Sequence, residues 1–269
     1  MIIPNQDKFD TKVRALQNLP FHIVTDFDKT LTKAFINGKK VQSSYSLLRE
    51  GNYLNDNFAE RSQKFFNEFR KYEDSNESLE FRQNKMNEWW HANWSLMKEC
   101  GLSKSDLQDI VDKEKFESRE GLSEFFSLIE RIPVLIFSAG LGDLIQLFLS
   151  KHDLLTPNIH IVSNFCAFDE TGNVKEVPSH FVHTLNKNEI EIKNKPYYQE
   201  VKNKENVILL GDRIDDLGMV AGIDHDIILK IGFYNGDSKT IEEYKKHFDM
   251  IITDDGTMEE VNKLLVSIL

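Results

Sequence analysis

The sequence predicts an α/β fold in which a mainly parallel sheet is covered by helices on both faces and interrupted by a helical insertion. Three observations support this prediction. An apolar segment typical of a buried strand lies near the start of the chain, at residues 21–27. A long, charged, helix-like block follows it, and after residue 118 short apolar segments alternate with amphipathic ones. Such alternation is typical of parallel sheets, whose ligands bind at the carboxyl ends of the strands.

The first part of the chain supplies one strand and the insertion. Residues 21–27 (FHIVTDF) are apolar and end in polar residues, which indicates a buried strand that opens into a site. Aromatic residues then recur at three- and four-residue steps, as in segments 55–73 and 79–100, which indicates amphipathic helices. The change in periodicity predicts a core made of residues 1–32 and 118–269 and a helical domain made of residues 33–117.

The rest of the chain alternates strands and helices. Short apolar segments bounded by polar residues predict strands, and longer amphipathic segments predict helices. The predicted strands are residues 132–138, 158–164, 206–212, 225–233 and 249–255. The predicted helices are residues 119–131, 140–152, 215–223, 238–248 and 257–269.

The composition indicates an ordinary globular protein. The 269 residues are 40% hydrophobic and 29% charged, with a net charge of −11, so we expect no nucleic-acid polymer as a partner. No apolar stretch approaches the roughly 20 residues that span a bilayer, and the first residues do not resemble a signal peptide. The two cysteines form no CxxC pair, which fits a reducing compartment. We therefore expect a cytoplasmic monomer without a membrane partner.

Two carboxylates lie two residues apart at the end of the first predicted strand. Asp26 and Asp28 share a face of an extended chain, so they repel each other unless a cation or a proton intervenes. They could form a polar strand end in which Asp28 caps the next turn. Alternatively, Asp26 is a nucleophile that attacks phosphorus and Asp28 is its acid/base partner. Thr30 and nearby backbone amides would then bind the anion.

A second acidic cluster, GDRIDD, follows the strand predicted at 206–212. One of its aspartates, for which we favour Asp215, would stabilise the amino end of the next helix. Asp212 directly follows the apolar segment and could approach Asp26. Together with a backbone carbonyl and a substrate phosphate, two carboxylates are sufficient ligands for Mg²⁺.

Two further features could bind a phosphate. Ser138, in FSAG, begins a predicted helix, where it is either a helix cap or a phosphate ligand. A transferring phosphoryl group also needs a cation. Lys187 is the best placed by sequence order, but it is one of several candidate lysines.

DFDKTLT, FSAG, a following lysine and GDRIDD, in that order, resemble the four motifs of the haloacid dehalogenase (HAD) superfamily of phosphohydrolases. More narrowly, segments such as NGKKVQSSYSLL, MNEWW, REGLSEFF, PNIHIVSNF and HTLNKN resemble the cytosolic 5′-nucleotidase III, or pyrimidine 5′-nucleotidase, group. The resemblance covers nearly the whole chain. It implies a Rossmann-like HAD core with an inserted helical cap that closes over the substrate.

Carried over by position, the resemblance implies a role for each motif residue. Asp26 would be the nucleophile and Asp28 the general acid/base. The implied Mg²⁺ ligands are the Asp26 carboxylate, the Asp28 backbone carbonyl and Asp212, with Asp216 in the outer coordination sphere. The expected phosphate-binding residues are, in all, Thr30, Ser138, Ala139 and Lys187.

The chain departs from the family pattern at two places. Asp215 replaces the glycine of GDxxGD, which stiffens the loop or adds a charge. The base-recognising glutamate of the family falls in KYEDSNE, where Glu73 is the nearest match and Asp74 the alternative. Trp89 and Trp90 could stack on a base or belong to the interior, and we expect one of them to face the ligand.

The resulting hypothesis is a magnesium-dependent 5′-nucleotidase. It would hydrolyse nucleoside 5′-monophosphates, with CMP and UMP first, through an aspartyl-phosphate, and could transfer phosphate to a second nucleoside as a side reaction. One alternative is a HAD phosphatase for 7-methylguanosine monophosphate, phosphoserine or a sugar phosphate. Another is a binding module that keeps the fold without catalysis.

Overall fold

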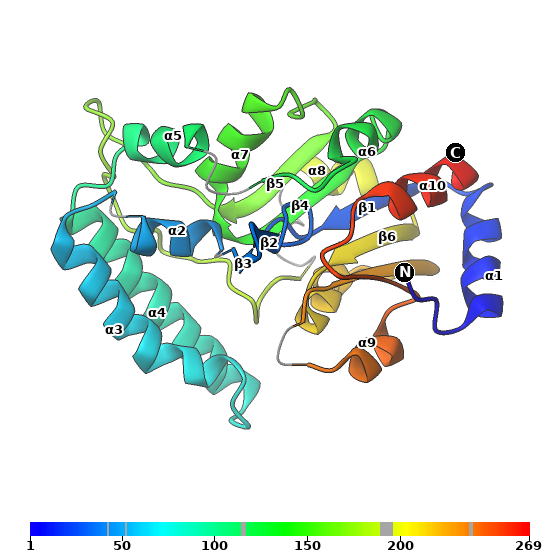
Figure 1. Ribbon diagram of the computed structural model, residues 1–269, viewed down its shortest axis with the longest axis horizontal. Coiled ribbons are helices and arrows are strands. Elements are labelled where there is room, and N and C mark those ends of the chain that lie inside the picture. The colour runs from blue at the N-terminus through cyan, green and yellow to red at the C-terminus, as the bar shows by residue number, and fades with distance from the viewer. Residues whose placement is uncertain (42, 52, 114–116, 189–195, 237–238) are drawn as a thin grey trace.

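A six-stranded parallel sheet forms the centre of the protein (Figure 1). The structure, a computed structural model, describes residues 1–41, 43–51, 53–113, 117–188, 196–236 and 239–269. The strand order is β5-β4-β1-β6-β7-β8. The bounds are β1 (Phe21–Thr25), β4 (Val134–Leu141), β5 (Ile159–Asn164), β6 (Asn206–Gly211), β7 (Ile227–Tyr234) and β8 (Met250–Thr253). The predicted α/β fold is therefore confirmed.

The two faces of the sheet contribute to separate hydrophobic clusters. In β1, Ile23 belongs to the larger cluster and the next residue, Val24, to the second. Because strands buried on both faces are continuously apolar, these segments could be found in the sequence. The larger cluster includes residues of α1 (Gln6–Leu16), α6 (Leu122–Leu128), α7 (Gly142–Lys151) and α10 (Glu259–Ile268). The second includes residues of α8 (Pro196–Val201) and the 3₁₀ helix η2 (Ile214–Val220), while α9 (Ile241–His247) joins a third.

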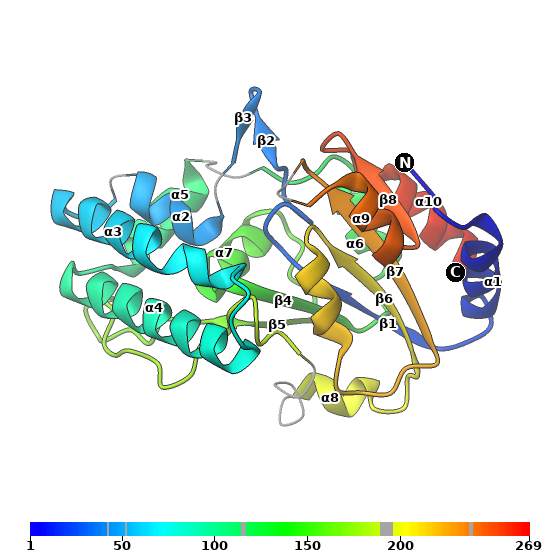
Figure 2. The ribbon, with the colours of Figure 1, turned by 90° about the horizontal axis from the view of Figure 1, so that it is seen from below.

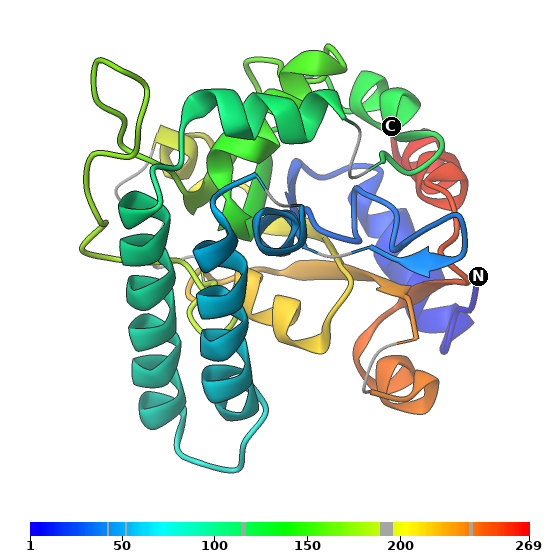
Figure 3. The same ribbon diagram turned by 60° about the vertical axis from the view of Figure 1, so that its left-hand side comes forward.

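Four helices lie beside the sheet, on the side away from both chain termini (Figure 1). Of these, α3 and α4 pack side by side as a helical pair (Figure 3). The side chains of Asn55 and Ser78 cap their amino ends by accepting the N–H of Phe58 and Phe81. The four helices are α2 (Ser44–Glu50), α3 (Asp56–Glu73), α4 (Leu79–Glu99) and α5 (Lys104–Asp112). No helix in the described part of the chain is long and apolar enough to cross a membrane.

The structure differs from the sequence-based expectation in four places. A hairpin of β2 (Phe35–Ile36) and β3 (Lys39–Lys40) projects from the molecule where only helices were expected (Figure 2). Its turn is Asn37-Gly38, with φ of 52° and 73°, a common hairpin dipeptide that was overlooked. The helices α1 and α8 were also not predicted. The segment expected to form a helix at 215–223 instead gives η2, whose tighter turn starts where Asp216 accepts the N–H of Arg213.

Candidate active site

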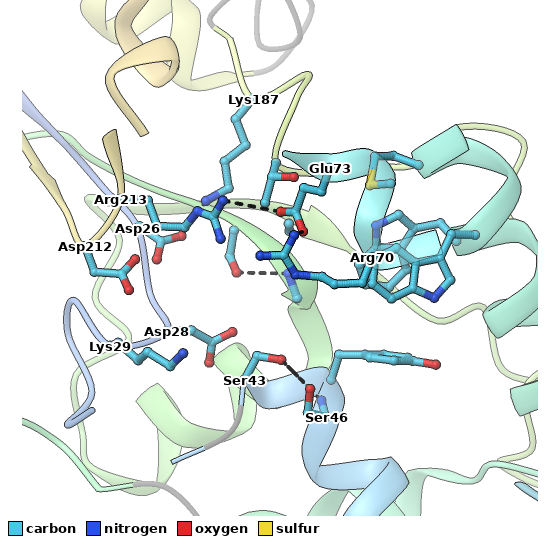
Figure 4. A pocket seen from close by; sticks show the side chains of 18 of the residues that line it. Asp26, Asp28, Lys29, Ser43, Ser46, Arg70, Glu73, Lys187, Asp212 and Arg213 are labelled. Carbon is cyan, nitrogen blue, oxygen red and sulfur yellow. Dashed lines mark hydrogen bonds and ion pairs between the residues drawn. The ribbon is translucent and has the colours of Figure 1, made fainter. Parts of the chain in front are cut away.

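The carboxyl ends of β4, β1 and β6 meet at a cavity of about 330 Å³, which α2, α3 and α4 also line (Figure 4). The chain order reverses at β1, with β4 and β5 on one side and β6 to β8 on the other. Ligands of open α/β sheets bind at such reversal points. The core residues that line the cavity include Asp26, Asp28, Ser138, Lys187, Asp212 and Asp216.

An ion-paired triad is buried at the sheet end of this cavity. Lys187 Nζ lies 2.5 Å from Asp26 Oδ1 and 3.1 Å from Asp216 Oδ1. Burial raises the pKa of Asp26, an effect that Lys187 opposes and the charge of Asp216 reinforces. Burial lowers the pKa of Lys187, but the two carboxylates outweigh it and the net pKa is raised. Lys187 therefore remains charged.

Asp212 adds a third buried carboxylate to this group. Oxygen atoms of Asp26, Asp212 and Asp216 lie within 4.8 Å of one another. The ammonium of Lys187 pairs with Asp26 and Asp216, and the charges of Arg119 and Arg213 act on Asp212. Buried charges are stable only when they are paired or bind a metal, so this donor set suits a divalent cation that prefers oxygen ligands.

Asp28 is oriented from the helical side of the cavity. Ser44, at the start of α2, donates its backbone N–H to Asp28 Oδ1 and its hydroxyl to Oδ2, both at 2.9 Å. A Cβ atom on Gly140 would lie 2.3 Å from Ser44 Oγ, so glycine is required for this approach. Burial raises the pKa of Asp28, and the hydrogen bonds from Ser44 offset part of the rise. A carboxyl group that retains a proton more readily is suited to act as an acid.

A buried arginine, Arg119, holds the loop after β1 through several hydrogen bonds. Lys29 in this loop has a φ of 63°, which is uncommon for a residue other than glycine. Arg119 donates to the carbonyl oxygens of Lys29 (2.5 Å) and Thr30 (2.8 Å). It also donates to Asp255 Oδ1 (2.8 Å) and to the carbonyl of Gly256 (2.6 Å). One guanidinium thus joins the loop after β1 to the loop after β8.

The predicted phosphate-binding residues divide into two groups. Ser138, Ala139 and Lys187 all line the cavity, and Ser138 Oγ accepts the N–H of Gly140 at 3.0 Å. Thr30 is fully buried and lies outside the residues that line the cavity. The left-handed turn at the preceding residue directs the chain into the core at this point. The structure therefore brings three of the four candidates together.

Glu73, the last residue of α3, lines the cavity between two arginines (Figure 4). Arg70 Nη1 lies 2.9 Å from Glu73 Oε2, and Arg213 Nη2 lies 3.6 Å from Glu73 Oε1. Asp74 pairs with the same arginines, at 2.9 Å and 3.7 Å, but is not among the lining residues. Of the two acidic candidates, the structure brings Glu73 to the cavity.

Trp89 and Trp90 both line the cavity and also pack against aromatic neighbours. Trp89 is stacked on Phe69 with 6.4 Å between ring centroids and 10° between the planes. Trp90 meets Tyr45 edge to face at 5.2 Å. From the sequence, ligand contact and interior packing were considered as alternatives. In the structure each tryptophan can do both, because it lines the cavity and also packs against aromatic side chains.

Several cavity residues were not singled out from the sequence. Arg213 lies within GDRIDD, and its Nη2 pairs with Asp215 Oδ2 at 2.9 Å. Asp215, which replaces the family glycine, is thus the nearest counter-ion of an arginine that also reaches Glu73. Further cavity residues lie on faces of α2, α3 and α4 whose orientation the sequence does not give: Tyr45, Ser46, Arg49, Phe66, Arg70, Met86 and Asn93.

Known proteins resemble this chain over most of its length. The family described as pyrimidine 5′-nucleotidase (UMPH-1) matches residues 29–269. The 7-methylguanosine phosphate-specific 5′-nucleotidase of Rattus norvegicus is 34% identical over 252 residues, which cover 92% of this chain and 84% of that protein. The putative cytosolic 5′-nucleotidase 3 of Caenorhabditis elegans is 30% identical over 259 residues, covering 90% and 68%.

Solved structures are also similar to this chain over most of its length. The crystal structure of cytosolic 5′-nucleotidase IIIB bound to cytidine has a TM-score of 0.88 and 29% identity, covering 99% of this chain and 93% of that one. A phosphoserine phosphatase in the form of a phospho-aspartyl intermediate analogue, at 18% identity, 91% and 98% coverage and a TM-score of 0.55, shares the fold alone. The family match and the curated relatives both extend over most of the chain. The chain therefore belongs to the pyrimidine 5′-nucleotidase (UMPH-1) family.

Proposed function

We propose that this protein is a magnesium-dependent 5′-nucleotidase that releases phosphate from nucleoside 5′-monophosphates, with CMP and UMP as the first candidates. The observation that carries the proposal is the meeting of Asp26, Asp28, Lys187 and two further buried carboxylates at one end of a single cavity. Family membership supports the reaction, and the cytidine in the related crystal structure supports a pyrimidine nucleoside at the other end.

In the proposed reaction, a carboxylate oxygen of Asp26 attacks phosphorus while Asp28 gives its proton to the departing 5′-oxygen of the nucleoside. A water molecule then attacks the aspartyl-phosphate and gives one proton to Asp28, which restores both groups. Lys187, Ser138 and the backbone at Ala139 would bind the phosphoryl oxygens and balance their charge. A second nucleoside in place of water would give phosphoryl transfer.

The donor set fits Mg²⁺ because it offers carboxylate oxygens of three buried side chains within 4.8 Å of one another. In this proposal Asp26, Asp212 and the backbone carbonyl of Asp28 would hold the ion, with Asp216 in the outer coordination sphere. The ion would supply positive charge for the phosphoryl oxygens.

We further infer that residues 33–117 act as a cap over a core made of residues 1–32 and 118–269. A cap would exclude water and select the nucleoside, and its candidates for base contact are Glu73, Trp89 and Trp90. The names of relatives described as cytosolic 5′-nucleotidases support a cytoplasmic location.

A second substrate is favoured by the names of the relatives. Relatives from Rattus norvegicus to Drosophila melanogaster are named 7-methylguanosine phosphate-specific 5′-nucleotidases, at 34% and 32% identity. The tryptophans of the cavity offer faces on which a methylated purine, like a pyrimidine, could stack. 7-Methylguanosine monophosphate is therefore the alternative within the same reaction.

Phosphate release over a panel of esters tests the proposal. The panel contains CMP, UMP, 7-methylguanosine monophosphate, AMP, phosphoserine and glucose 6-phosphate, each with Mg²⁺. We expect a nucleotide to give the highest kcat/KM, and Asp26→Asn to abolish turnover while its melting curve remains cooperative. A preference for phosphoserine or the sugar phosphate would exclude the nucleotidase assignment, and an active Asp26→Asn enzyme would exclude the nucleophile.

A further inference from the structure

Arg49 is a buried cation in the cavity for which the proposed chemistry has no role. It lies near the end of α2, and its side chain is 8% exposed. It lines the same cavity as Asp28. Its guanidinium lies 4.6 Å from the centroid of the Phe66 ring, so one of its faces is covered by an aromatic plane. A charge this deeply buried requires acceptors around it.

Among the described residues, Arg49 has fewer acceptors than it has donors. A guanidinium carries five N–H donors. Nη2 donates to Glu50 Oε1 at 3.1 Å, but the Glu50 side chain is itself 45% exposed and therefore partly hydrated. Nε is buried without a hydrogen-bond partner in the part of the chain that the structure describes. The guanidinium of a residue that lines the cavity is therefore not fully hydrogen-bonded by the described residues.

Arg49 lies further along α2 than Ser44, the residue that contacts Asp28. Ser44, at the start of the helix, contacts Asp28. Arg49 follows five residues later, about 7.5 Å further along the axis at the usual rise of α-helices. Tyr45, one turn before Arg49 on the same face, packs against Trp90 in the cavity wall. Arg49 thus lies among aromatic side chains, beyond the predicted phosphate site.

We propose that Arg49 selects the substrate by donating a hydrogen bond to a carbonyl oxygen of the base. The proposal rests on the proposed function, because it takes the substrate to be a nucleotide. The class of substrate is then a nucleoside 5′-monophosphate whose base carries a carbonyl group, as cytosine, uracil and 7-methylguanine do. Adenine has no carbonyl oxygen, so AMP would gain nothing from Arg49.

The test compares substrates that have a carbonyl oxygen on the base with substrates that have none. Arg49→Gln should lower kcat/KM for CMP and UMP by about 10- to 100-fold, the usual effect of a hydrogen bond to a charged group. The kcat/KM for AMP and for ribose 5-phosphate, which has no base, should change less than twofold. Arg49→Lys keeps the charge but lacks the planar guanidinium, so its kcat/KM for CMP and UMP should lie between those of the wild type and Arg49→Gln. The control is Arg61→Gln, which changes an arginine that pairs with Glu99 on the exposed side of α3.

A measurement without turnover completes the test. The inhibition constant of the product cytidine should rise by the same factor in Arg49→Gln, and that of adenosine should not. Equal losses for CMP, AMP and ribose 5-phosphate, or no loss for any of them, would overturn the role of Arg49. If Arg49→Gln does not fold, the same comparison in Arg49→Lys decides. A wild-type protein that releases phosphate only from esters other than nucleotides would instead overturn the proposed function.

Discussion

Replacing Arg119 by methionine tests how the loop after β1 is held. The Arg119 side chain is 0% exposed, and its substitution breaks the ion pair with Asp255 and removes the donor from the carbonyls of Thr30 and Gly256. The carbonyl of Lys29 also loses this donor but keeps the one from Asn235 Nδ2. Breaking a buried ion pair costs about 3–5 kcal/mol. Each buried carbonyl left unpaired costs about 1–3 kcal/mol more, although entering water would recover part of this. We therefore expect Arg119→Met to lower the free energy of unfolding by at least about 3 kcal/mol.

The same substitution should reduce turnover in the molecules that remain folded. The left-handed conformation of Lys29 directly follows Asp28, and only over-determined surroundings maintain such a conformation. A displacement of about 1 Å in a reacting group can cost about 100-fold in rate, so we expect kcat to fall by about that factor with a small change in KM. Urea unfolding and steady-state phosphate release measure the two effects.

The controls separate stability from positioning. Arg131→Met changes an exposed arginine and should alter neither quantity. Millimolar guanidinium added to Arg119→Ala should restore part of kcat if the cation orients the loop. An Arg119→Met protein with wild-type unfolding and wild-type kcat would refute the reasoning. A destabilised variant with normal kcat would refute the positioning step alone.

Two further predictions concern buried ionisable groups. Mg²⁺ at about 100 times its Kd should stabilise the fold by about 2.7 kcal/mol, which raises Tm by roughly 5 °C or more. In thermal melts, Asp212→Asn should remove most of this gain. The control Asp169→Asn, which changes an exposed aspartate, should leave the gain unchanged. Burial, with a smaller contribution from the charge of His180, lowers the pKa of His183 to about 4. The unfolded chain therefore binds one more proton between about pH 4 and 6.5, so the folded state loses stability as the pH falls through this range, by about 2 kcal/mol between pH 6.5 and 5. Urea unfolding at several pH values should show this loss reduced in His183→Asn; an identical pH dependence would contradict it.

The parts of the fold that could be predicted are those that local pattern determines. β1 and β6 are buried on both faces, so each appears in the sequence as a continuous apolar segment with carboxylates after it. The hairpin at Asn37-Gly38 was also marked locally, by a dipeptide that tolerates positive φ, and could have been found. By contrast, Thr30 was expected to bind the anion together with the backbone amides after Asp26, but it is not among the residues that line the cavity. Its carbonyl accepts a hydrogen bond from Arg119, which is 89 residues away in the sequence, and no local pattern reports that contact.

The same distinction separates the two ends of the cavity. The proposed catalytic groups come from short segments at strand ends, and parallel strands bring their carboxyl ends to one edge, so a motif and a fold class suffice to place them together. The residues at the other end come from successive turns of α2, α3 and α4, and their direction depends on how the helices pack. Asp215 is an example. Compared with the glycine of the family pattern, it appears in the sequence only as an added charge. In the structure it pairs with Arg213, whose second partner is Glu73 on α3. Because the groups that would select the base are assembled by tertiary contacts of this kind, relatives can share the reaction while they differ in the nucleotide they accept.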